Sequence, residues 1–160
     1  MAKNSLPWIV VAACVSALSL AACGSDEPSE VAVPDTPTVA SNACPVDGCA
    51  IKILDAAREG DEIALTWEPN FLPDVSKNHI HVYWDKYDAD QVSSDAEARG
   101  VSQGEWVPTA EVPTYVTGSA VSVDNRGAST TLCVTAGDRN HVVIDASIVD
   151  CLDVSDLLRR

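Results

Sequence analysis

Apolar and polar residues alternate along most of the chain after residue 43, and this alternation is typical of β-strands that bury one face. Turn-forming residues separate the alternating segments: Gly60 follows the first of them, and Pro69 and Pro73 lie between the second and the third. The pattern predicts strands at residues 50–54, 62–67, 78–85, 120–123, 131–135 and 151–154.

One segment departs from this alternation. Residues 88–99 read DADQVSSDAEAR and are rich in helix-forming residues, with Asp88 in the position of an N-cap and Gly100 after the last residue. We therefore expect a short helix inserted in one connection of an all-β chain. Short strands separated by turns over about 110 residues resemble an antiparallel immunoglobulin-like or fibronectin-III-like β-sandwich. An up-and-down barrel is the alternative architecture.

The first 22 residues have the pattern of an export signal. Lys3 gives a positive start, and residues 6–20 form an apolar run. This run of about 15 residues is shorter than the roughly 20 that a membrane-spanning helix needs. We therefore expect a signal peptide over residues 1–22.

The residues Leu20-Ala21-Ala22-Cys23 resemble the lipobox of bacterial lipoproteins. The resemblance implies that the chain is cut before Cys23 and that Cys23 carries acyl chains such as palmitate. Several acyl chains, each contributing roughly 0.8 kcal/mol per buried CH₂, would anchor the protein on the extracytoplasmic face of a cell-envelope membrane. The alternative is an ordinary secretory signal that contains a chance cysteine.

Composition divides the remaining chain into a tether and a domain. Residues 23–43 contain three prolines and no aromatic residue, so we expect a disordered tether that begins at the lipidated cysteine. Residues 44–154 are expected to form the β-domain, and residues 155–160 a C-terminal tail.

The charge balance is strongly acidic, with 10 Lys and Arg against 24 Asp and Glu. Removing residues 1–22 takes away Lys3 and no acid, which leaves a net charge of −15. Such a charge argues against nucleic acid as a partner and against adsorption to anionic lipid through charge. The expected membrane contact is therefore the lipid anchor alone.

Four cysteines follow the predicted lipidated Cys23, and an even number in an exported domain indicates disulfides. If the apolar neighbours of Cys133 and of Cys151 face the core, both cysteines point outward from adjacent antiparallel strands. We therefore predict the disulfide Cys133–Cys151, which leaves Cys44 and Cys49 to close a small turn.

The predicted Cys133–Cys151 pairing also places a loop. Residues 137–147 then connect two paired strands, with His141 near the tip. Long loops in compact domains are often functional. The alternative is that the apolar residues 142–144 fold this loop back onto the core as a lid.

Two of the chain's three histidines lie on one predicted strand. Ile80 and Val82 must face the core, so we expect His79 and His81 to point outward into solvent. Two imidazoles at i and i+2 can hold one metal ion at about 2.0–2.1 Å. In an immunoglobulin-like topology the loop before this strand and the loop with His141 lie at the same end of the domain.

The three histidines are thus candidate ligands for zinc or copper, the ions that suit imidazole. His79, His81 and His141 would bind the ion, and Asp138 and Asp85 would complete or orient the site. The alternatives are pH-sensitive hydrogen bonds between strand and loop, or plain surface or structural histidines.

Two weaker candidates lie elsewhere. Trp106 is predicted as an exposed aromatic residue for partner contact, with a plug on the core as the alternative. Asp85, Asp88 and Asp90 suggest calcium, but the segment lacks the Gly and the terminal Glu of an EF-hand loop.

No GxSxG, HExxH, P-loop or Rossmann glycine motif occurs in the chain, so we expect that the protein is not an enzyme. The first hypothesis is a membrane-anchored, non-enzymatic binding module for an unknown protein or envelope ligand. The alternative is a zinc- or copper-binding envelope lipoprotein that uses the three histidines.

Overall fold

The computed structural model describes residues 41–159. The predicted signal peptide, Cys23 and most of the predicted tether lie outside these residues. Within the described part of the chain, no helix is long and apolar enough to cross a membrane.

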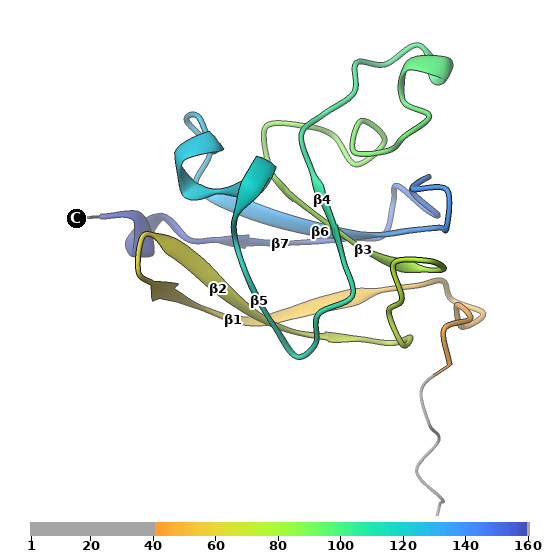
Figure 1. Ribbon diagram of the computed structural model, residues 1–160, viewed down its shortest axis with the longest axis horizontal. Helices are drawn as coiled ribbons and strands as arrows, with labels where there is room; N and C mark the ends of the chain where they lie inside the picture. Colours follow the sequence, from red (N-terminus) through yellow and green to blue (C-terminus); the bar gives the residue numbers. More distant parts are fainter. Residues whose placement is uncertain (1–40, 160) are drawn as a thin grey trace, which may run out of the picture. The chain divides into compact units, whose positions relative to one another are not determined.

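Seven strands form two antiparallel sheets (Figure 1). One sheet has the order β1-β2-β5, and its strands span Ile51–Glu59, Glu62–Pro69 and Thr114–Val116. The other has the order β4-β3-β6-β7, and its strands span Val107–Thr109, His79–Trp84, Thr131–Gly137 and Val149–Asp153. The predicted all-β class is confirmed.

Alternate residues of the strands build the core between the two sheets. Ile63, Leu65 and Trp67 of β2 are at most 1% exposed, as are Ile80 and Val82 of β3. Each such side chain contributes about 1.5–3 kcal/mol through burial. The core therefore fixes which face of β3 points inward and leaves the histidine face on the other side of the sheet.

Five of the six predicted strands are present, with ends that differ by a few residues. The predicted strand at residues 120–123 is wrong, because this segment forms two 3₁₀ turns, Ser119–Val121 and Val123–Asn125. The Glu62 carboxylate holds the second turn, since it accepts hydrogen bonds from the Ser122 hydroxyl and the Val123 amide. The short strands β4 and β5 were not predicted, and each has only three residues.

The predicted helix over residues 88–99 is also wrong. The segment consists of turns and one 3₁₀ turn, Glu97–Arg99, which ends at Gly100 with φ 80°. Its backbone bonds to other segments: the Ser94 amide donates to the His141 carbonyl at 2.8 Å, and the Gly104 amide donates to the Gln91 carbonyl at 2.8 Å. These long-range contacts and the segment's own i to i−3 turn bonds, such as Ala96 N–H to the Ser93 carbonyl, take the place of a continuous series of i to i−4 bonds.

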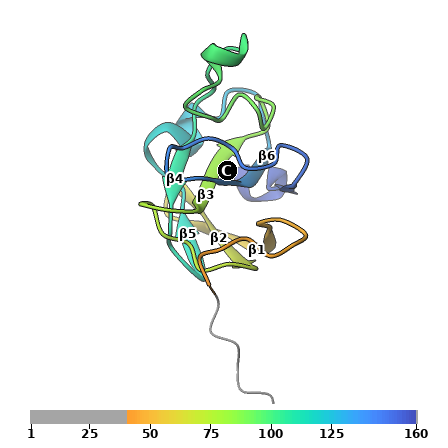
Figure 2. The same cartoon turned by 90° about the vertical axis from the view of Figure 1, so that its right-hand side faces the viewer.

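Both predicted disulfides are present, Cys133–Cys151 and Cys44–Cys49. Cys133 and Cys151 lie directly opposite each other in the β6–β7 register. After β7, the 3₁₀ turn Ser155–Leu158 packs Leu157 and Leu158 against the core. Figure 2 faces the end of the domain where residues 41–50 and the loop between β6 and β7 lie.

Candidate metal centre

The three histidines come from two parts of the second sheet. His79 and His81 lie on β3, and His141 lies in the loop between β6 and β7. As predicted, His79 and His81 point away from the core that contains Ile80 and Val82. The expected solvent exposure is wrong, because both histidines are 0% exposed.

A second apolar cluster covers this outer face of the sheet. The connection between β3 and β4 leaves the sheet on the side away from β1 and β2 and then returns to it (Figure 1). Its residues Ala89 and Val92 pack with Tyr83 and Cys133 of the strands and with Val143 of the β6–β7 loop. Strand alternation alone could not predict this covering layer, which converts an outward position into a buried one.

The imidazoles converge in the space below this layer. The His79 Nε2 atom lies 3.0 Å from His81 Nε2 and 2.9 Å from His141 Nδ1. One ring nitrogen from each histidine lies within 4.8 Å of the other two, and no other group of three potential metal-ligating side chains in residues 41–159 meets this distance. The predicted convergence of the three histidines is therefore present.

Backbone carbonyls fix the proton positions of two rings. His79 Nδ1 lies 3.0 Å from the Lys77 carbonyl, and His81 Nδ1 lies 2.7 Å from the Val92 carbonyl. A carbonyl oxygen only accepts, so each Nδ1 must carry a hydrogen. In a neutral imidazole the other nitrogen is then an unprotonated acceptor.

It follows that His79 Nε2 and His81 Nε2 direct lone pairs at each other across 3.0 Å. That distance suits a hydrogen bond, but neither neutral ring has a proton to donate there. His141 can supply one proton, to His79, and His81 Nε2 then still has no donor. A cation bound to both nitrogens would remove this mismatch.

An added proton on His79 Nε2 or His81 Nε2 is unfavourable, because it would place a positive charge on a buried ring. Burial lowers the pKa of His79, and the nearby His141 lowers it further. Burial and then the nearby His79 lower the pKa of His81 to about 3. Near neutral pH both rings are therefore uncharged, which is the form that binds metal.

The β6–β7 loop holds His141 in an unusual backbone conformation, with φ 60° in the left-handed region. Asp138 fixes the loop, because its Oδ1 accepts hydrogen bonds from the amides of Asn140 at 2.8 Å and Val142 at 2.9 Å. Burial raises the pKa of Asp138, but these amides outweigh it and keep the pKa below its usual value. A non-glycine residue in this region costs about 1 kcal/mol or more and is often found at functional sites.

Gly137 leaves room for the imidazole ring of His81. A Cβ atom at this position would lie 2.3 Å from His81 Nε2 and 2.6 Å from His81 Cε1. Any larger residue would displace the imidazole. No sequence motif marked Gly137 or the Lys77 and Val92 carbonyls, since their roles depend on contacts between distant segments.

Trp106 does not form an isolated exposed patch. It is partly buried, and its indole stacks on the His81 ring with centroids 4.0 Å apart and an interplanar angle of 22°. The side chain forms one wall of the histidine cluster, which agrees more closely with a plug than with a free partner surface.

The acidic candidates fall in different places. Asp138 supports the His141 loop, whereas Asp85 follows the opposite end of β3 from His79 and does not belong to the cluster. Asp85, Asp88 and Asp90 line one pocket of about 300 Å³. They are not among the residues whose ligand atoms converge, so the calcium hypothesis gains no support.

The chain matches no protein-family model, no curated protein and no solved structure. The interpretation of the site therefore depends on its own geometry.

Proposed function

We propose that the domain is a non-enzymatic metal-binding module that holds one zinc or copper ion through His79 Nε2, His81 Nε2 and His141 Nδ1. One observation supports this proposal above the others: the Lys77 and Val92 carbonyls fix both β3 rings with their Nε2 lone pairs facing each other. Carbonyls that accept the second ring N–H are typical partners of metal-ligating histidines.

The spacing suits such an ion with little rearrangement. Nitrogens bound at 2.0–2.1 Å to a tetrahedral ion lie about 3.3–3.4 Å apart. The observed separations from His79 Nε2 to its two neighbours are 2.9 and 3.0 Å. Shifts of a few tenths of an ångström in those two contacts, with a closer approach of His81 to His141, would form the site.

The ligand set favours zinc or copper. All three candidate ligands are imidazoles, which suit these ions, whereas magnesium and calcium prefer oxygen. Three protein ligands leave one tetrahedral position for a water or another donor.

We also propose that the domain is an immunoglobulin-like sandwich. In the immunoglobulin fold strands A, B and E pair in one sheet, and strands C, F and G pair in the other. The orders β1-β2-β5 and β3-β6-β7 correspond to these sets, with β4 added beside β3. This arrangement supports a β-sandwich over a closed barrel.

The location is the third part of the proposal: a lipid on Cys23 anchors the protein to the extracytoplasmic face of an envelope membrane. It is supported by the sequence Leu20-Ala21-Ala22-Cys23 and by two disulfides, which are typical of exported proteins. Cys23→Ser should abolish labelling by a fatty-acid analogue and release the protein from membranes. Retention in the membrane fraction would contradict the anchor.

Metal titration tests the main proposal. The full chain, purified in detergent and stripped with EDTA, should bind one Zn²⁺ or Cu²⁺ per chain in equilibrium dialysis. His141→Asn keeps a residue that tolerates φ 60° but lacks the imidazole, so its affinity should fall at least tenfold.

Asp90→Asn is the matched control, because it removes a carboxylate from the separate acidic pocket and should leave the affinity unchanged. Wild-type protein that retains no ion after dialysis, or a loss of affinity equal in the two variants, would refute the metal site.

A further inference from the structure

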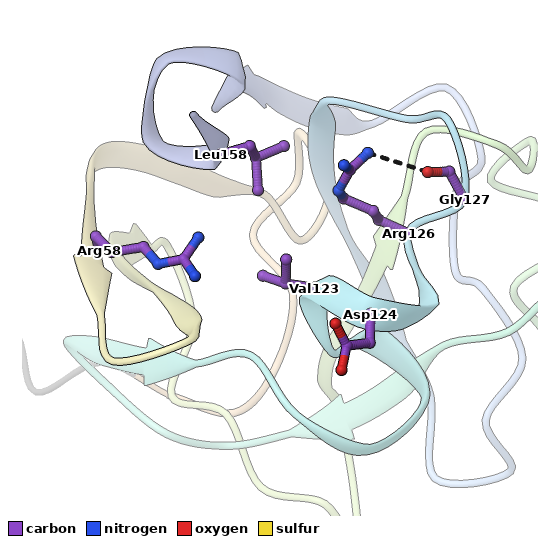
Figure 3. A pocket seen from close by; sticks show the side chains of 6 residues that line it. All are labelled: Arg58, Val123, Asp124, Arg126, Gly127 and Leu158. Carbon is purple, nitrogen blue, oxygen red and sulfur yellow. Dashed lines mark hydrogen bonds between the residues drawn. The ribbon is translucent and has the colours of Figure 1, made fainter. Parts of the chain in front are cut away.

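A second pocket lies in a different part of the domain from the histidines. Its volume is about 360 Å³. It lies between the end of the β1–β2 hairpin, the 3₁₀ turn Val123–Asn125 and the C-terminal turn (Figure 3). The residues that line it are Arg58, Val123, Asp124, Arg126, Gly127 and Leu158.

Backbone carbonyls hold the two arginines of this pocket. Arg58 Nε donates to the Gly60 carbonyl at 2.8 Å, and its Nη1 donates to the Leu157 carbonyl at 3.3 Å. Arg126 Nη1 donates to the carbonyls of Gly127 at 3.0 Å and Ser129 at 3.2 Å. These bonds restrict the side chains without neutralising them, and they leave other N–H groups of each guanidinium unused.

The positive charge of the pocket is only partly compensated. Among residues 41–159, no carboxylate forms an ion pair with Arg126, and Arg58 has one contact, with Asp61 at 3.5 Å. Asp124 is the one acidic residue in the lining.

Glu62 lies near Arg58, but its oxygens accept hydrogen bonds from Ser122, Thr117 and the Val123 amide. Burial raises the pKa of Glu62, and these bonds outweigh it and lower the pKa. Its charge is therefore already engaged in holding the turn that forms one wall of the pocket.

We propose that this pocket binds a small oxyanion, a carboxylate or a phosphoryl group, with a short apolar body. Figure 3 shows the guanidinium groups of Arg58 and Arg126 directed into the space beside Val123 and Leu158. Guanidinium groups match the oxygens of carboxylates and phosphates in forked geometry, and those two apolar side chains offer a surface for carbon atoms. The chain as a whole carries a net charge of −14, so this pair of arginines is an exception to its acidic character.

Thermal unfolding in the presence of two probes tests the proposal. EDTA-treated full chain, which excludes any contribution from the histidine site, is titrated with sodium phosphate and with sodium isobutyrate. Sodium chloride at matched ionic strength corrects for screening of charge. At least one probe should raise the melting temperature saturably, because a ligand that binds only the folded state stabilises it.

Variants distinguish the pocket from general charge effects. Arg126→Gln should weaken binding at least tenfold. Arg159→Gln should bind as the wild type does, since Arg159 carries the same charge in the C-terminal turn region but does not line this pocket. Asp124→Asn should bind the probe several-fold more tightly, because it removes the only acidic side chain of the pocket lining. Asp124 is exposed, so this variant still tests the pocket if Arg126→Gln fails to fold.

Tighter binding of isobutyrate would assign a carboxylate ligand, and tighter binding of phosphate would assign a phosphoryl group. Saturation by neither probe overturns the proposal. Equal losses in Arg126→Gln and Arg159→Gln, or no gain in Asp124→Asn, would also overturn it.

Discussion

At the scale of single residues, the chemistry of the histidine cluster depends on which nitrogen of each imidazole carries its proton. The Lys77 and Val92 carbonyls place the protons of His79 and His81 on Nδ1. The distance of 3.0 Å between the Nε2 atoms therefore joins two acceptors rather than a donor and an acceptor. A metal ion bound as we propose would satisfy both acceptors.

Gly137 permits this arrangement, and its substitution gives a direct prediction. Gly137→Ala places a methyl group where His81 Nε2 lies 2.3 Å away, so the ring must move. We expect a loss of about 1–3 kcal/mol in the free energy of unfolding, measured with urea, together with weaker zinc binding.

Gly118→Ala is the matched control, since a methyl group added there would meet no heavy atom within 4 Å and the φ of 178° suits any residue. It should change the stability by no more than about 0.5 kcal/mol. A Gly137→Ala protein as stable as this control would mean that the glycine does not pack against His81.

At the scale of secondary-structure elements, the connection between β3 and β4 turns an exposed strand face into a buried site. It carries the Val92 carbonyl to His81, stacks Trp106 on the same ring and bonds to the β6–β7 loop that holds His141. The site thus depends on two irregular segments that pack on one regular strand.

Ser93 joins these two segments. Its hydroxyl accepts from the Val143 amide at 3.1 Å and donates to Asp95 at 2.6 Å, and the residue is 0% exposed. Ser93→Ala leaves the Val143 amide buried without a partner, which should cost about 1–3 kcal/mol. Hydrogen exchange should show faster opening at Val143.

Ser94→Ala removes a neighbouring exposed hydroxyl but keeps the bond from the Ser94 amide to the His141 carbonyl. It should cost no more than about 1 kcal/mol. Equal losses in the two variants would contradict a special role for Ser93.

The sequence was sufficient to predict the regular part of this arrangement. Alternation on β3 identified which side chains face the core, and the facing cysteines gave the β6–β7 register and the loop that carries His141. The burial of the histidines could not be predicted in this way. It depends on how residues 85–106 fold back, and their composition indicated a helix that tertiary contacts replace with turns.

At the scale of the whole molecule, the buried histidines link stability to pH. The pKa of His81 is about 3 in the folded protein, against an ordinary value of 6.5, and the pKa of His79 is also lowered. The unfolded chain therefore binds more protons than the folded chain below pH 6.5. The contribution of these neutral histidines to the free energy of unfolding is complete above that pH and is lost as the pH decreases towards about 3.

Urea unfolding of the EDTA-treated protein should reveal this loss. Between pH 6.5 and 5 the free energy of unfolding should decrease by up to about 1.4 kcal/mol per pH unit for each such histidine. The carboxylates with lowered pKa, such as Glu62, remain ionised over this range and contribute little. A flat profile from pH 7 to 5 would contradict the burial of neutral histidines.

The most direct test of the proposed metal centre is X-ray absorption spectroscopy at the zinc edge of the full chain, loaded with one equivalent of Zn²⁺ and freed of unbound ion. We predict three nitrogen ligands at about 2.0–2.1 Å with the multiple-scattering signal of imidazole. The signal of one imidazole should disappear in His141→Asn. A shell of oxygen atoms without imidazole, or no retained zinc, would contradict the claim that His79, His81 and His141 form a metal centre.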